Sequence, residues 1–122
     1  MPAGKSALIV EAEFLIALDL QRMLEGLGFL DLRICRHPTE ALRQATGWTG
    51  VGLAVIEVRH HSGDALHLVG MLRQHRVPTI AITSDTEVLR GIDGLADIPV
   101  NGKPVSEDQL AAAIHRILGT PA

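Results

Sequence analysis

Short apolar runs separated by longer amphipathic stretches restrict the fold of this chain more than any other feature. Residues 7–10, 51–56 and 79–82 are almost entirely apolar and do not alternate with polar residues. Such runs are typical of parallel strands covered on both faces. Residues 30–34 do alternate, and residues 97–100 are few and contain a proline. We therefore expect these last two segments to be edge strands.

Helical spacing fills the segments between the runs. Apolar residues recur every three or four positions in residues 16–27, 66–72 and 110–118. The order strand then helix occurs five times, which predicts an α/β fold with a doubly wound parallel sheet and right-handed crossovers. We find no linker, repeat or low-complexity segment, so we expect residues 1–122 to form one domain.

Two helix starts have recognisable capping sequences. Ser106 and Gln109 have the spacing of a capping box at the start of the last helix. Ser84 and Glu87 have the same spacing, but Gly91 follows shortly after, so we expect a weak helix there.

Composition excludes several classes of function. The formal net charge is −3 and the only aromatic residues are Phe14, Phe29 and Trp48, so neither charge nor stacking favours nucleic acid. The same scarcity predicts an aliphatic core. No apolar run approaches the roughly 20 residues that span a membrane. The single cysteine, Cys35, is typical of a reducing cytoplasm, and we expect it to be buried and unreactive at a strand end.

Polar side chains gather where the predicted strands end. In a doubly wound sheet the functional crevice lies beyond the carboxyl ends of the strands. The residues at those ends are Glu11, Ala12 and Glu13, the segment 57–64, Thr83 with Ser84, and Lys103 with Pro104.

This set of strand ends resembles the receiver domains of two-component signalling, over nearly the whole chain. Glu11 and Ala12 stand where that family has an acidic pair, and Glu57 stands at its phospho-accepting aspartate. Thr83 matches the hydroxyl residue, and Lys103-Pro104 matches the lysine–proline pair. The resemblance implies a flavodoxin-like (CheY-like) sheet of order 2-1-3-4-5, with a cis bond at the lysine–proline pair.

The resemblance also implies chemistry that this chain has altered. Receivers bring a carboxylate to a phosphoryl group with Mg²⁺ held by acidic side chains. Glu57 is one methylene longer than aspartate, and a misplacement of about 1 Å can cost about a hundredfold in rate. Ala12 replaces a principal metal ligand, so we expect Mg²⁺ binding to be weak or lost and no other cofactor. Val100 stands where receivers often carry an aromatic switch residue.

Three positions keep the phosphoryl-binding pattern of the family: Thr83, Ser84 and Lys103. We expect Lys103 and Thr83 to satisfy each other and Glu57, since buried polar groups need partners. Glu57 is then either a fixed mimic of a phosphorylated residue or one half of a structural ion pair.

We therefore predict a degenerate receiver domain that is not an enzyme and acts in the cytoplasm by protein contact. Its partner would be a histidine kinase, a phosphotransfer protein or an output protein. Leu15 and Leu18 fall off the main apolar stripe of the first helix. A homodimer through that helix face and partial burial within the monomer are both open interpretations.

Two other functions stay open. One is true phosphotransfer on an unusual acceptor, Glu57 or Asp64. The other is a small-ligand sensor or enzyme using the crevice around Glu11, Glu57, Thr83 and Lys103. The adjacent pair His60-His61 suggests a metal, but the chain lacks a third ligand at suitable spacing.

Overall fold

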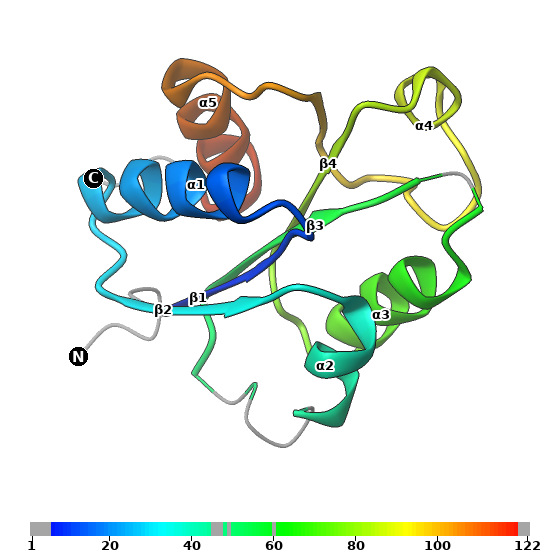
Figure 1. Ribbon diagram of the computed structural model, residues 1–122, viewed down its shortest axis with the longest axis horizontal. Helices are drawn as coiled ribbons and strands as arrows, with labels where there is room; N and C mark the ends of the chain where they lie inside the picture. The colour runs from blue at the N-terminus through cyan, green and yellow to red at the C-terminus, as the bar shows by residue number, and fades with distance from the viewer. Residues whose placement is uncertain (1–5, 45–47, 49, 60, 120–122) are drawn as a thin grey trace.

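The computed structural model describes residues 6–44, 48, 50–59 and 61–119, and within them strands alternate with helices along the chain (Figure 1). The strands are β1 (Ser6–Val10), β2 (Asp31–Cys35), β3 (Leu53–Glu57), β4 (Thr79–Thr83) and β5 (Val100–Gly102). The helices are α1 (Phe14–Gly26), α2 (Pro38–Arg43), α3 (Gly63–Gln74), α4 (Thr86–Arg90) and α5 (Glu107–Leu118).

All five strands pair in parallel to form one sheet in the order β2-β1-β3-β4-β5. This is the predicted order, and β2 and β5 are its edges as expected. The strand order reverses between β1 and β3, which places the switch point of the fold at the ends of these two central strands.

Helices cover the sheet on both sides. Figure 1 shows α1 and α5 on one face and α2 and α3 on the other. Successive residues of a strand point to opposite faces. Accordingly, Ala7 and Ile9 of β1 pack into the α1/α5 cluster, whereas Leu8 and Val10 pack into the cluster beneath α2 and α3. The apolar runs of the central strands are continuous because both faces are buried.

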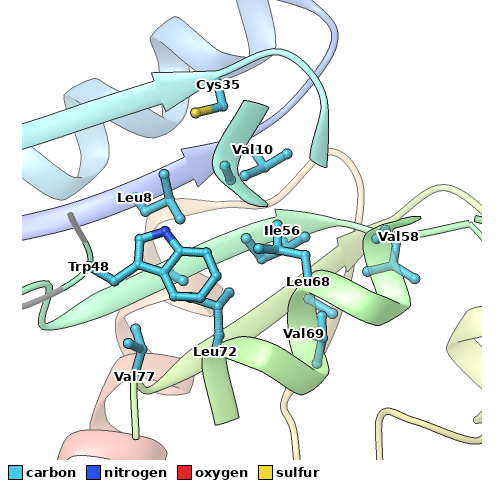
Figure 2. Close-up of a cluster of buried hydrophobic side chains, with 14 of the residues drawn as sticks. Leu8, Val10, Cys35, Trp48, Ile56, Val58, Leu68, Val69, Leu72 and Val77 are labelled. Atoms are coloured by element: carbon cyan, nitrogen blue, oxygen red, sulfur yellow. The ribbon is translucent and has the colours of Figure 1, made fainter. Parts of the chain in front are cut away.

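The core on the α2/α3 side is built around an aromatic residue (Figure 2). Trp48 is fully buried and is the largest such side chain among the described residues. Its ring meets that of His75 edge-on, with centroids 5.2 Å apart and planes at 85°. Phe29 is buried in the other cluster. The core is aliphatic, as predicted, except for these two buried aromatic side chains.

Cys35 is the last residue of β2 and is buried, as predicted. Burial raises the pKa of its thiol, and the negative charge of Glu40 adds to the effect. A protonated thiol is a poor nucleophile, which is consistent with an unreactive cysteine.

The last strand begins later than predicted. β5 covers Val100–Gly102, not residues 97–100. Asp97 has a positive φ of 68°, which is incompatible with an extended strand. Pro99 precedes the strand, and its carbonyl accepts a hydrogen bond from Ala81 N at 2.9 Å. A proline fits here because only its carbonyl is needed for pairing.

One predicted cap is confirmed and the other is wrong. At α5, Ser106 and Gln109 form both hydrogen bonds of a capping box. At α4 the cap is Asp85, whose side chain accepts from Glu87 N at 2.9 Å, and not Ser84. The helix is short, as expected, and ends at Gly91 with φ 107°.

In the described part of the chain no helix has both the length and the apolarity to cross a membrane.

Candidate functional site

Three strand ends bring two glutamates and a lysine together. Glu57 is the last residue of β3. Glu11 follows β1, and its backbone N–H donates to Cys35 O at 3.0 Å. Lys103 follows β5, and its backbone N–H donates to Thr83 O at 2.7 Å. These two backbone hydrogen bonds extend the pairing of the strands by one residue. The sheet therefore fixes the backbone positions from which the side chains of Glu11 and Lys103 project.

The lysine ammonium lies between the two carboxylates. Lys103 Nζ donates a hydrogen bond to Glu57 Oε2 at 2.8 Å and lies 2.9 Å from Glu11 Oε1. The contact to Glu11 is an ion pair, and Glu11 Oε1 has no hydrogen-bond partner among the described residues. All three side chains are almost completely buried. The site therefore holds two carboxylates against one internal cation.

The second oxygen of Glu11 is used locally. Glu11 Oε2 accepts a hydrogen bond from the backbone N–H of Glu13 at 3.0 Å. This bond ties the carboxylate to the loop between β1 and α1. Glu11 is thus held from both sides and has little freedom to turn toward another ligand.

The two glutamates differ in acidity. Burial raises the pKa of Glu11, and the negative charge of Glu57 raises it further. Hydrogen bonding to the Glu13 amide and the charge of Lys103 lower this pKa, but they offset only part of the increase. Burial would also raise the pKa of Glu57, but its bond and attraction to Lys103, with smaller help from the Ala12 backbone and Arg59, lower the pKa below its usual range. Burial opposes the charge on Lys103, yet the two carboxylates raise the pKa of its ammonium above the usual value. Charge is therefore concentrated in the Glu57–Lys103 pair.

Thr83 and Ser84 were predicted to take part in this site, but their side chains do not join the cluster of Glu11, Glu57 and Lys103. The Thr83 hydroxyl is fully buried and accepts from the backbone N–H of Asp85 at 2.9 Å. It serves the start of α4, so the expectation that Thr83 and Lys103 satisfy each other is correct only for their backbones. Ser84 is exposed beside it.

Val100 is half-buried in β5 and packs against the cluster beneath α2 and α3. The Lys103-Pro104 peptide is cis, as the resemblance implied.

An open cleft of about 230 Å³ borders Glu57 on the side of β2. Its walls come from the ends of β1, β2 and β3 and are made by Val10, Ala12, Arg36, His37, Pro38, Glu57, Arg59 and Ser62. The methyl group of Ala12 is the only side chain here from the β1–α1 loop. The cleft lies where the sequence analysis expected the acidic metal pocket.

Two arginines at this cleft were missed by the sequence analysis. Arg59 Nη2 lies 3.6 Å from Glu57 Oε2, with its side chain 65% exposed. Arg36 Nη2 donates to the carbonyl of Ala12 at 3.4 Å. Arg36 directly follows β2, and Arg59 lies two residues after β3. Their positions after strands that end at the site are the sequence signal that could have identified them. They make this side of the site cationic.

The metal and acceptor alternatives gain no support from neighbouring residues. Within the described ranges, no three His, Cys, Asp or Glu side chains come close enough together to hold a metal ion. His61 is exposed, and His60 lies outside the described residues. Asp64 is an exposed residue in the first turn of α3.

The comparisons with known proteins place the chain among signalling domains. No family model matches the sequence. It is 33% identical over 115 residues to the phyllosphere-induced regulator PhyR of Methylorubrum extorquens, a match that covers 91% of this chain and 42% of that protein. The solution structure of the PhyR response regulator REC domain from Erythrobacter litoralis has a TM-score of 0.75 at 26% identity, covering 98% of this chain and 95% of that domain. The chain is homologous to response-regulator receiver domains.

A second, longer homologue also matches this chain over only part of its own length. The anti-anti-sigma factor PhyR from Bartonella quintana is 28% identical, with a TM-score of 0.75 over 94% of this chain and 48% of that structure. The chain thus spans less than half the length of the longer proteins it matches.

Proposed function

We propose that this chain is an atypical receiver domain that works by contact with signalling proteins, without phosphorylation of the usual acceptor position. One observation supports this above all: the Lys103 ammonium lies within 3 Å of both carboxylates that a receiver would use. A pocket whose two carboxylates already share an internal ammonium offers less attraction to an added cation than an unpaired acidic pocket would.

The geometry at Glu57 is unsuited to attack on a phosphoryl group. Glu57 Oε2 accepts a hydrogen bond from Lys103 at 2.8 Å and lies 3.6 Å from Arg59 Nη2, so this oxygen already has two cationic neighbours. Phosphoryl transfer depends on placing the attacking oxygen in line with the leaving group. Moving Oε2 away from Lys103 would leave Lys103 with Glu11 as its carboxylate partner.

The residues present do not fit Mg²⁺. The ion requires near-octahedral oxygen ligands at about 2.0–2.1 Å. Ala12 offers a methyl group on its side chain, and its carbonyl already accepts from Arg36. Glu11 is tied to Glu13 N and Lys103. Two guanidinium groups near the cleft add repulsion, so we propose that the domain uses no metal.

The homologues indicate what kind of partner to expect. They include a protein described as an anti-anti-sigma factor. For this chain we propose a protein partner in the same kind of signalling pathway: a histidine kinase, a phosphotransfer protein or an output protein. Because Glu11, Glu57 and Lys103 pair with one another, the site suits a domain that does not switch between a phosphorylated and an unphosphorylated state. We further propose a cytoplasmic location, which agrees with a free cysteine and a moderately acidic chain.

Intact-mass measurement after incubation with a small phosphoryl donor and Mg²⁺ tests the proposal. The natural chain should gain no phosphoryl group. The control is the variant Ala12→Asp with Glu57→Asp, and a second control adds Arg59→Met to remove the exposed cation that lies 3.6 Å from Glu57 in the natural chain. A phosphoryl gain in a control, but not in the natural chain, would support the proposal. A gain in the natural chain, mapped to Glu57 or Asp64, would establish the unusual-acceptor alternative instead.

A further inference from the structure

The outer face of α1 exposes an unusual amount of apolar surface. Phe14 is 69% exposed and Leu15 is 77% exposed, while Leu18 on the same side is half-buried. The inner face of this helix already anchors it to the sheet through Ala17, Leu20 and Leu24. Adjacent large apolar side chains in water cost free energy, and a cluster of them marks an interaction surface more often than an isolated one does.

Two opposite charges lie beside this apolar cluster. Asp19 and Arg22 line a shallow surface hollow with Leu15, Ile16 and Leu18. Both charged side chains are exposed, and the structure gives neither of them a hydrogen-bond or ion-pair partner within its described residues. The surface therefore carries its own positive and negative group, each without an internal counterpart.

We propose that this face of α1 binds a second copy of the chain, with the two helices antiparallel about a two-fold axis. Such an interface joins the same patch on both partners, so it must complement itself. The point midway between Asp19 and Arg22 falls between Leu20 and Gln21, close to the middle of α1, and the two-fold axis passes there. An antiparallel copy therefore brings Asp19 of each chain to the height of Arg22 of the other, because each residue rises about 1.5 Å along the axis.

The ends of the helix also match in this arrangement. Leu15 near the start of one helix faces Gly26 at the end of the other, which has no side chain of its own and has Glu107 Oε2 3.9 Å from where a Cβ would lie. The first turn of α1 contains no acidic residue and the last turn no basic residue. Antiparallel packing places the positive end of each helix dipole beside the negative end of the other, which is favourable.

This inference rests on the proposed function in one respect, that the domain works through protein contacts. It does not involve the Glu57–Lys103 pocket. Loss of the dimer would leave the phosphorylation result unchanged, and a phosphorylated pocket would leave the dimer unchanged. The two proposals therefore fail separately.

Sedimentation equilibrium over a range of concentrations tests the dimer. The natural chain should show a monomer–dimer equilibrium, and Leu15→Asp should weaken it at least tenfold. Leu30→Asp is the matched control, because Leu30 is 80% exposed and lies outside α1. A natural chain that is monomeric at every concentration, or equal weakening by both variants, would overturn the proposal.

Charge reversal gives a sharper test of the antiparallel geometry. Asp19→Arg alone and Arg22→Asp alone should each weaken self-association, since each creates two like-charge contacts across the axis. Combining both reversals in one chain should restore the dimer. Mixing the two single variants should also form a mixed dimer, because each then supplies the charge that the other lacks. Failure of both the double variant and the mixture to associate would rule out this pairing.

Discussion

Lys103 Nζ lies 2.8 Å from Glu57 Oε2 and 2.9 Å from Glu11 Oε1, so one ammonium serves two buried carboxylates. Removing one partner from a buried ion pair costs more than the pair contributes, because a charge is then left without compensation. This relationship determines how the domain should respond to mutation, pH and metal.

Replacing Lys103 should destabilise the domain strongly. Lys103→Met keeps most of the side-chain volume but leaves two buried carboxylates facing each other. We expect the free energy of unfolding near neutral pH to fall by about 3–5 kcal/mol, measured by urea denaturation. Arg59→Met is the control, since that exposed ion pair should contribute less than about 1 kcal/mol. A loss in Lys103→Met no larger than in Arg59→Met would show that the buried pair is unimportant.

The two glutamates should show opposite pH dependences of stability. The pKa of Glu57 is lower in the folded chain than its ordinary value of 4.5, so its contribution is present above that pH and is lost as pH falls through the folded pKa. The pKa of Glu11 is raised, so its contribution is present below pH 4.5 and is lost as pH rises through the folded pKa. The stability difference between the natural chain and Glu57→Gln should therefore grow with rising pH.

The matched variant Glu11→Gln should behave in the reverse sense. The stability difference between the natural chain and this variant should shrink, or change sign, as pH rises past 4.5. Thermal or urea unfolding across this range measures both differences. Parallel pH profiles for the two variants would contradict the assignment of charge to Glu57.

The cap of α4 should be detectable by mutation. Asp85→Ala removes the acceptor for Glu87 N and should lower the free energy of unfolding by about 1 kcal/mol. Ser84→Ala removes no cap and should stay within about 0.5 kcal/mol of the natural chain. If Ser84→Ala were the more damaging of the two, the helix start shown by the structure would be misplaced.

Cys35 should react slowly with thiol reagents in the native domain. Its burial and raised pKa keep it protonated and inaccessible, so a chromogenic disulfide reagent should modify it at the rate of unfolding. Addition of denaturant should make the reaction fast. Rapid modification under native conditions would show a mobile β2 end and a thiol available for chemistry.

The fold could be predicted from the sequence because its strongest signals are local. Continuous apolar runs predicted buried parallel strands, and the alternation in residues 30–34 correctly placed β2 at an edge. The start of β5 was wrong because a positive φ at Asp97 has no clear sequence signal. Ser84 and Asp85 are both good capping residues, so spacing alone could not choose between them.

The site was predictable in its membership and in the contact between Lys103 and Glu57, but not in its other contacts. The strand ends identified Glu11, Glu57 and Lys103, which the structure brings together. The engagement of the Thr83 hydroxyl by Asp85 N depends on the turn into α4, which no motif specified. Arg36 enters the site from β2, and its reach to Ala12 depends on the tertiary arrangement of two loops.

Calorimetric titration with Mg²⁺ tests most directly whether an internal ammonium has taken the place of the metal. The experiment compares the natural chain with Ala12→Asp plus Glu57→Asp, and with the same variant carrying Arg59→Met. Our account predicts no binding heat in the natural chain and measurable binding in at least one variant, strongest after Arg59 is removed. Binding of Mg²⁺ by the natural chain as tightly as by the variants would contradict the account.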